Sequence, residues 1–191
     1  GTVILFMVEV EQKFRLTKEN KERIQGMLDD RCGETAAIRQ VDTAFLLKGS
    51  SFKTFQRGDP VMRIRLTENG SVMLTYKRAL HDGEDCVEYE LTVDSAETAK
   101  RLLQEVGYMP MVHVDKRRRT YHLEDVLVTL DDVENLGSFM EIEALCADES
   151  GISDAKRAVD RVASEFHMKE RDREFRKYDE LLADSDGVHC L

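Results

Sequence analysis

Charged residues at alternate positions near the start of the chain are the first candidates for chemistry. They are Glu9, Glu11, Lys13 and Arg15. Because a β-strand alternates its side chains between two faces, all four would share one face of an extended segment, opposite Val10. Carboxylates two residues apart lie ~6.6 Å from each other on such a strand, and at an effective dielectric constant of 20 they repel by ~2.5 kcal/mol. The pattern therefore indicates either a solvated edge strand or a face that binds a cation beside an anionic ligand.

Two further segments repeat the alternation of carboxylates. Their acidic residues are Glu88, Glu90, Glu141 and Glu143. This amount of alternation exceeds what a scatter of surface charge suggests. Carboxylate oxygens are hard ligands that favour Mg²⁺ or Mn²⁺, and these ions also bridge phosphate oxygens. We therefore predict Mg²⁺ or Mn²⁺ as the cofactor.

Basic residues also occupy alternate positions, in segments that lie far apart along the chain. They include Arg63, Arg65, Lys77, Lys116 and Arg118. The last two belong to a run of consecutive basic residues, which could be a solvated loop or a nuclear-localisation-like patch. Val112 and Val114 precede that run with the alternation of a strand, so we favour a strand through it.

Convergence of these cations on one site would require a polyanionic ligand. The full set of predicted phosphate-binding residues is Lys13, Arg15, Arg63, Arg65, Lys77, Lys116 and Arg118. Arginine offers a planar fork that matches phosphate oxygens, and lysine offers a point charge. Without a ligand, so many inward cations would repel one another. The set therefore favours a ligand with three or four negative charges, such as a triphosphate, over a monoanion.

The elements that must position these residues are mostly short strands. We predict strands over about 3–15, 41–47, 61–67, 72–78, 87–93, 126–131 and 139–147, with a further strand or hairpin arm over 111–115 and 120–124. Helices are predicted over about 18–30 with Thr17 as the N-cap, from a cap at Asp94 or Ser95 to Gly107, over 152–166, and over 173–182. About eight strands with mostly short connections predict an α+β fold, in which an antiparallel sheet closes into a β-barrel with flanking helices. Charge alternation within these strands indicates a polar interior.

Composition narrows the function further. The chain has 191 residues, of which 35% are charged, and a net charge of −10. An acidic chain is a poor default binder of nucleic acid. The opening apolar run is seven residues long, short of the ~20 that a membrane span needs, and we expect no membrane partner and no signal peptide. The cysteines are scattered, which favours reduced thiols and a cytoplasmic location over a disulfide framework or zinc ribbon: Cys32, Cys86, Cys146 and Cys190.

The order of the motifs resembles the CYTH superfamily, the triphosphate tunnel metalloenzymes, and is most similar to its class IV adenylyl cyclase branch. The resemblance extends from Glu9 to about Leu182. It is carried by Glu9-x-Glu11-x-Lys13, Arg63-x-Arg65, Tyr76-Lys77, Lys116-x-Arg118, the segment 130–143, and Arg176-x-Tyr178-x-Glu180. We therefore expect one CYTH-like domain over residues 1–191, with its barrel over about 3–147 and its C-terminal helices over about 152–183.

The resemblance also implies roles for individual residues. Glu9, Glu11 and Glu141 match residues associated with the divalent metal, and Glu143 is predicted to join them. Lys13, Arg65, Lys77, Lys116 and Arg118 match residues that bind phosphates. Asp131 matches an active-site acid, and we predict Asp131, Lys116 and Arg118 as catalytic. Two positions depart from the family pattern: Cys86 stands where an arginine is frequent, and Lys177 replaces a serine.

The function implied by the resemblance is conversion of ATP to cyclic AMP and pyrophosphate. A triphosphatase acting on inorganic triphosphate, thiamine triphosphate or a nucleotide would need the same charged residues, so the charged motifs do not separate these two enzymes. A non-catalytic sensor of a nucleotide or polyphosphate is the third reading, ranked last because every metal-type carboxylate is present. The resemblance is also compatible with a homodimer.

Overall fold

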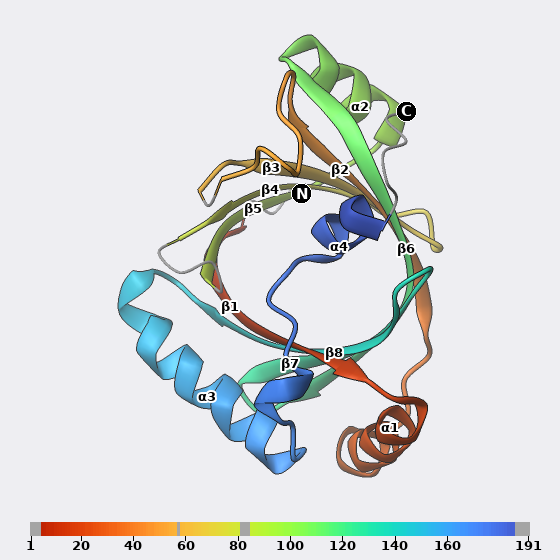
Figure 1. Ribbon diagram of the computed structural model, residues 1–191, viewed down its shortest axis with the longest axis vertical. Coiled ribbons are helices and arrows are strands. Elements are labelled where there is room, and N and C mark those ends of the chain that lie inside the picture. Colours follow the sequence, from red (N-terminus) through yellow and green to blue (C-terminus); the bar gives the residue numbers. More distant parts are fainter. Residues whose placement is uncertain (1–4, 57, 81–84, 186–191) are drawn as a thin grey trace.

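Eight antiparallel strands form a closed barrel in the computed structural model, which describes residues 5–56, 58–80 and 85–185 (Figure 1). The order around the barrel is β1-β5-β4-β3-β2-β6-β7-β8, and β8 pairs back with β1. The predicted fold class is therefore confirmed. Residues 3 and 4 of the predicted first strand, and Cys190, lie outside the described residues. The strands are β1 (Leu5–Leu16), β2 (Ile38–Leu47), β3 (Val61–Thr67), β4 (Val72–Ala79), β5 (Asp85–Val93), β6 (Tyr108–Leu123), β7 (Val126–Val133) and β8 (Gly137–Cys146).

Four α-helices among the described residues surround this barrel. They are α1 (Lys18–Cys32), α2 (Ala96–Glu105), α3 (Ile152–Glu165) and α4 (Tyr178–Ser185), with short 3₁₀ turns η1 (Glu149–Gly151) and η2 (Glu170–Asp172). The predicted caps of the first two are confirmed, because the side chains of Thr17 and Ser95 each accept a hydrogen bond from a backbone N–H in the first turn. In Figure 1, α1 and α3 lie outside the barrel, whereas α4 lies at its opening.

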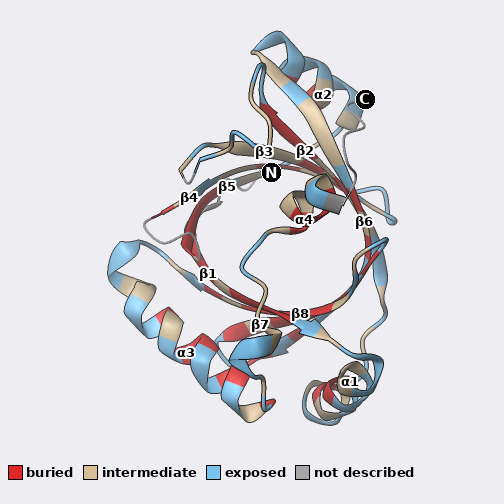
Figure 2. Cartoon of the chain, in the orientation of Figure 1, coloured by how far each residue is buried: buried red, intermediate tan, exposed pale blue. Residues whose placement is uncertain are grey.

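The two faces of the barrel strands differ in polarity, as strand alternation requires. On β1, Val8, Val10 and Phe14 are buried under the outer helices, with Val10 and Phe14 in one apolar cluster with Ile24 of α1 and Val159 of α3. The alternate residues Glu9, Glu11 and Lys13 point into the barrel. Figure 2 shows buried segments around the barrel strands and along part of α3. The main core therefore lies between the barrel and the helices, which leaves the barrel interior available for charged groups.

The run of basic residues in β6 lies within one continuous strand rather than at a break between two arms. Lys116 pairs with Gln40 of β2, and Arg118 pairs with both Ile38 of β2 and Asp131 of β7. Two neighbouring strands thus supply hydrogen-bond partners across the run. This continuous ladder holds Lys116 and Arg118 on the inner face.

The predicted helix over 173–182 is wrong in its first half. Residues 173–177, which we call the strap, are not helical, Arg173 has an extended backbone, and α4 begins only at Tyr178. Arg173 forms an isolated bridge with Phe14, and the backbone N–H of Glu174 donates to the carbonyl of Lys13 at 2.9 Å. Pairing with β1 competes with helix formation here, and it draws the strap across the barrel opening (Figure 1).

Two further observations concern the cysteines and the helices. Cys32, Cys86 and Cys146 are free thiols. No helix among the described residues is long and apolar enough to cross a membrane.

Candidate active site

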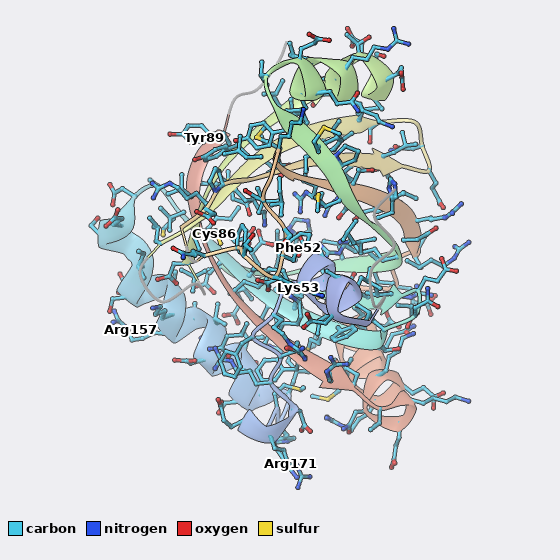
Figure 3. All side chains as sticks on the ribbon, turned by 45° about the horizontal axis from the view of Figure 1, so that its top comes forward. Phe52, Lys53, Cys86, Tyr89, Arg157 and Arg171 are labelled. Carbon is cyan, nitrogen blue, oxygen red and sulfur yellow. The ribbon has the colours of Figure 1, made fainter. Side chains whose placement is uncertain are left out.

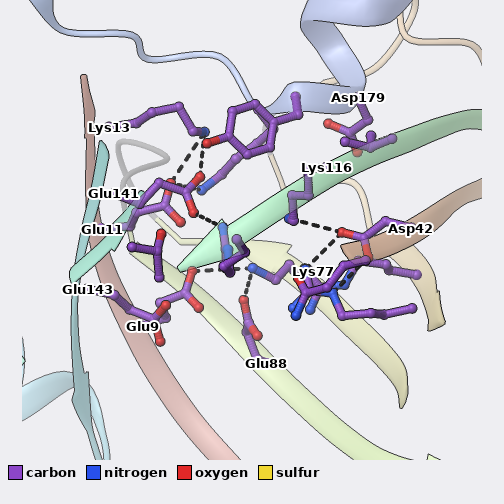
Figure 4. A pocket seen from close by; sticks show the side chains of 18 of the residues that line it. Glu9, Glu11, Lys13, Asp42, Lys77, Glu88, Lys116, Glu141, Glu143 and Asp179 are labelled. Atoms are coloured by element: carbon purple, nitrogen blue, oxygen red, sulfur yellow. Dashed lines mark hydrogen bonds and ion pairs between the residues drawn. The ribbon is translucent and has the colours of Figure 1, made fainter. Parts of the chain in front are cut away.

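The barrel encloses a cavity of about 370 Å³ (Figure 4), a volume within the range of small-molecule sites. Charged side chains from most of the strands and from the C-terminal segment line it. The basic ones are Lys13, Arg63, Arg65, Lys77, Lys116, Arg118 and Lys177, and the acidic ones are Glu9, Glu11, Asp42, Glu88, Glu90, Glu141, Glu143 and Asp179. Charges of both signs are thus concentrated in one hollow.

One side of the cavity is a carboxylate wall, formed by Glu9 and Glu11 of β1, Glu88 of β5, and Glu141 and Glu143 of β8. These three strands are adjacent in the order β8-β1-β5. The register places Glu11 directly opposite Glu143. Like charges in opposed positions of a ladder are destabilising unless cations offset them. The closure of the barrel through β1 and β8 therefore creates the high density of negative charge.

The pKa values of the wall divide its carboxyls into two kinds. Burial, together with repulsion from Glu143 and Glu88, raises the pKa of Glu9 well above its ordinary value. Burial also raises the pKa of Glu143 to about 7, against opposition from Lys77 and with support from Glu11 and Glu88. These two carboxyls have less positive charge around them than ionisation in this buried site requires.

Two other carboxyls of the wall are stabilised as anions by cations. Burial opposes the ionisation of Glu11, but the ammonium groups of Lys177 and Lys13 hold its pKa well below the ordinary value. For Glu141, burial and the charge of Glu11 are outweighed by Arg118 and Lys13, which lower its pKa to about 2.

Two lysine side chains from the barrel strands contact the carboxylate wall. Lys13 Nζ lies 3.4 Å from both Glu11 Oε1 and Glu141 Oε1. Lys77, on β4, reaches across to Glu9 Oε1 at 3.3 Å and also pairs with Glu88 (Figure 4).

The facing side of the cavity is a basic wall, formed by Arg63 and Arg65 of β3 and Lys116 and Arg118 of β6. Strand β2 lies between β3 and β6 and supplies Asp42. Both Asp42 oxygens accept from Arg65, at 2.7 and 2.8 Å, and Oδ2 also accepts from Lys116 at 3.3 Å. Burial opposes the ionisation of Asp42, but Lys116 and Arg65 hold its pKa well below the ordinary value. Asp42 is therefore the fixed counter-ion of this wall.

The expectation that the inward cations repel one another unopposed without a ligand is wrong. The inward cations do not face unopposed repulsion, because acidic partners accompany them inside the barrel. Burial, and then the charge of Arg118, lower the pKa of Lys116 to about 8.

Most of the predicted site residues meet in this cavity. Lining it are Glu9, Glu11, Lys13, Arg63, Arg65, Lys77, Lys116, Arg118, Glu141 and Glu143. Asp131 lies behind Arg118 and is fully buried. Its two oxygens accept from Arg118 at 2.7 and 2.5 Å, and Oδ2 also accepts from the hydroxyl of Tyr178 at 2.9 Å.

Arg15 is the exception among the predicted phosphate-binding residues. Its side chain is 45% exposed and pairs with Glu174 Oε2 of the strap at 2.8 Å. Alternation assigns Arg15 to the inner face, but it lies close to the end of β1, where the strap provides a carboxylate outside the cavity. The structure therefore places Arg15 at the strap and not in the cavity lining, and its role in phosphate binding stays a prediction.

Several lining residues were not predicted to belong to the site. For Glu88 the sequence offers only its alternation with Glu90, and Asp42 stands in a segment without a repeated charge. The alternation of Gln40, Asp42 and Ala44 along β2 was the available signal for Asp42. Lys177 and Asp179 had no periodic signal, because they enter the cavity from the C-terminal segment rather than from a strand.

The donor chemistry of the carboxylate wall fits a hard divalent cation. Oxygen ligands are what Mg²⁺ and Mn²⁺ prefer, and the raised pKa values of Glu9 and Glu143 indicate a deficit of positive charge. Within the described part of the chain, no three histidine, cysteine, aspartate or glutamate side chains are grouped as a metal site requires. Ammonium groups instead hold Glu9, Glu11 and Glu141.

Comparisons with known proteins agree with this architecture. The CYTH domain family model matches residues 7–178. Among curated proteins, the chain is 27% identical over 146 residues to a Methanocaldococcus jannaschii protein named "Putative adenylate cyclase MJ0240", an alignment that covers 74% of this chain and 79% of that protein.

Solved structures share the fold over nearly the full chain. The PH1819 protein of Pyrococcus horikoshii is 28% identical, with a TM-score of 0.78 over 93% of this chain and 99% of that one. The HpAC1 protein of Hippeastrum is 16% identical, with a TM-score of 0.59 over 96% and 97% of the two chains, and is described as having a dominant triphosphatase activity. At that identity the second likeness supports the fold alone.

Proposed function

This chain belongs to the CYTH family, and we propose that it is a metal-dependent enzyme that converts ATP to cyclic AMP and pyrophosphate inside the barrel. The observation that carries the proposal is the pair of opposed charged walls around one cavity. The name of the Methanocaldococcus jannaschii relative supports the cyclase reading.

The basic wall would bind the triphosphate. Arg63, Arg65 and Arg118 present guanidinium groups, which match phosphate oxygens with two parallel hydrogen bonds. Lys116 and Lys13 add ammonium groups beside them. Because Asp42 and Asp131 already orient Arg65 and Arg118, these forks would bind phosphate with little further ordering.

The carboxylate wall would hold the cofactor. Mg²⁺ or Mn²⁺ bound by Glu9, Glu11 and Glu141, with Glu143 beside them, would neutralise phosphate charge and polarise the reacting phosphorus. The protein's own contribution is the placement of these carboxylates across from the basic wall.

In the cyclase reaction, the ribose 3′-oxygen forms a bond to the α-phosphorus, and the bond from that phosphorus to the bridging oxygen breaks. Pyrophosphate leaves, and the hydroxyl proton is released. Lys116 and Arg118 would stabilise the charge that develops on the leaving group. Asp131 would act by positioning Arg118, since both of its oxygens are already engaged and it is fully buried.

A triphosphatase is the second candidate, and one feature of the lining favours it. Tyr178 is the one aromatic residue among the described residues that line the cavity. Lys13 and Lys116 lie 4.4 and 5.3 Å from the centre of its ring. Its ring is therefore already covered by cations, and a nucleobase would have to stack elsewhere. A hydrolase acting on inorganic or thiamine triphosphate would use the same charged residues, with water attacking the terminal phosphorus.

One assay separates the candidates. The protein is incubated with Mg²⁺ or Mn²⁺ and, in separate reactions, with ATP, inorganic triphosphate or thiamine triphosphate. Formation of cyclic AMP and pyrophosphate from ATP supports the cyclase, and release of orthophosphate supports the hydrolase. Binding of these compounds without turnover would contradict both and leave a non-catalytic sensor.

Matched variants test the assignment of the carboxylate wall. Glu11→Gln removes one charge from the wall and should lower turnover by about 10³-fold or more, an effect of the size seen when one electrostatic element of a site is lost. Glu105→Gln removes the same charge from an exposed position on α2 and should leave turnover unchanged. Equal activity of the two variants would remove the metal role of Glu11.

A further inference from the structure

We propose that Lys177 is an internal counter-ion that occupies the carboxylate wall in place of the divalent cation and must withdraw from Glu11 when that cation binds. This inference rests on the proposed function, because it names a competitor for the same carboxylates. It also gives a role to a residue that departs from the family pattern.

The contact between Lys177 and the wall is direct. Lys177 Nζ donates to Glu11 Oε1 at 3.2 Å. Lys177 also lines the same cavity as Glu9 and Glu141. Its ammonium group therefore lies beside the carboxylates that are best suited to hold a metal.

The strap that carries Lys177 is anchored on both sides of it. On one side, Glu174 pairs with Arg15 at 2.8 Å, and its backbone N–H donates to the carbonyl of Lys13. On the other side, the hydroxyl of Tyr178 donates to Asp131. These contacts hold the backbone across the barrel opening (Figure 1), so Lys177 is directed inward by the fold and does not sample the site at random.

Lys177 differs from the other cations that touch the wall. Lys13 and Lys77 extend from barrel strands, where Lys13 pairs with β8 and Lys77 pairs with strands on both sides. Lys177 comes from a segment outside the barrel ladder, and its side chain is 31% exposed. Its ammonium group can therefore reach solvent by rotation of its own side chain.

The ammonium group and a divalent cation cannot share Glu11 at close range. Two cations a few ångströms apart repel strongly, even at the effective dielectric constant of a protein surface. A divalent ion must therefore displace Lys177, and the free energy of that displacement weakens the apparent affinity of the metal. The position of the strap thus influences the apparent affinity of the site for the divalent cation.

The test is Mn²⁺ binding to the full chain in the absence of any phosphate compound, followed through the electron paramagnetic resonance signal of free Mn²⁺. Lys177→Gln should bind Mn²⁺ about tenfold more tightly than the wild type. Lys177→Arg keeps the positive charge and should remain within about twofold of the wild type.

Arg171→Gln is the matched control. It removes the same charge from the C-terminal segment, but the Arg171 side chain is 75% exposed and points away from the barrel (Figure 3). Its Mn²⁺ affinity should stay within about twofold of the wild type. A tighter affinity in this control equal to that of Lys177→Gln would reduce the effect to net charge and overturn the proposal.

Thermal unfolding gives a second readout and reports whether the variants fold. Because a ligand that binds only the folded state raises its stability, Mn²⁺ should raise the Tm of Lys177→Gln more than that of the wild type. Unchanged or weaker Mn²⁺ binding by Lys177→Gln would overturn the counter-ion role and leave the proposed function standing. Failure of the wild type to bind Mn²⁺, with or without inorganic triphosphate, would overturn both.

Discussion

The two walls of the cavity carry opposite charges, and they balance those charges in different ways. In the basic wall, short acidic side chains from neighbouring strands neutralise the cations. Asp42 accepts hydrogen bonds from Arg65 and Lys116, and Asp131 accepts them from Arg118. The carboxylate wall depends on lysine side chains that reach across strands or enter from the strap, and on Arg118, which also pairs with Glu141. The first arrangement is rigid and neutralised, whereas the second leaves carboxyls with raised pKa values.

The difference shows which wall has balanced charges in the absence of a ligand. A buried ion pair is costly to break, because the remaining partner keeps a desolvated charge. A cluster of like charges has the opposite behaviour, since removal of one member relieves repulsion. Removal of a negative charge should therefore destabilise the basic wall, whereas its removal from a carboxyl with a raised pKa should stabilise the carboxylate wall.

The largest effect is expected from the basic wall. Asp42→Asn would leave Arg65 and Lys116 without their shared counter-ion, and should lower the free energy of unfolding by about 3–5 kcal/mol. Urea denaturation at pH 7 measures this loss. Asp30→Asn, at an exposed position of α1, is the control with the same charge change. A loss below about 1 kcal/mol for Asp42→Asn would mean that Asp42 is not the counter-ion of Arg65 and Lys116.

The opposite sign is expected from the carboxylate wall. The pKa of Glu143 is raised from 4.5 to about 7 in the folded chain. The folded state therefore binds this proton more tightly than the unfolded state, and the associated stability is lost as the pH rises through about 7. At pH 8, without divalent metal, Glu143→Gln should raise the free energy of unfolding by about 1–3 kcal/mol.

Urea denaturation at two pH values checks this expectation. The gain in stability should shrink at pH 5, where Glu143 of the wild type is already protonated in the folded state. A destabilised Glu143→Gln at pH 8 would show that the wall is not overcharged, and the contrast between the two walls would be lost.

A smaller effect concerns Lys116 of the basic wall. Because the pKa of Lys116 is lowered to about 8, its ammonium group is lost as the pH rises through that value. The affinity for inorganic triphosphate should therefore fall about tenfold from pH 7 to pH 9, through this single proton. Isothermal titration calorimetry of the wild type and of Lys116→Arg makes the test, since arginine stays charged and should remove this part of the fall. Identical pH profiles would separate Lys116 from phosphate binding.

The smallest effect is expected outside both walls. Arg15 is exposed where it pairs with Glu174, and the Glu174 carboxylate keeps Arg176 as a second partner. Pairs with an exposed member contribute about 0.2–1 kcal/mol. Arg15→Gln should therefore change stability by no more than that, and should leave triphosphate affinity within about twofold. A tenfold loss of affinity would return Arg15 to the phosphate-binding set.

Much of the fold follows from local patterns in the sequence. Alternation assigned Glu9, Glu11 and Lys13 to one face, and the structure places them in the cavity while Val10 and Phe14 pack against the helices. The starts of α1 and α2 were readable from Thr17 and Ser95, because a cap is a contact over three residues. The sequence predicts a helix that includes the strap, but the strap pairs with β1 through Arg173 and Phe14 instead. Because these residues are more than 150 positions apart in the sequence, no local pattern shows this pairing.

Local patterns define which strand side chains share a face, since the period of a strand is a local property of the backbone. Which of these side chains meet depends on the folded chain. Closure of the barrel set Glu11 opposite Glu143, the register of β2 and β3 placed Asp42 beside Arg65, and docking of the strap brought Lys177 to Glu11. Charge–charge energies depend on distances between residues that are remote in sequence, and only the folded chain defines those distances.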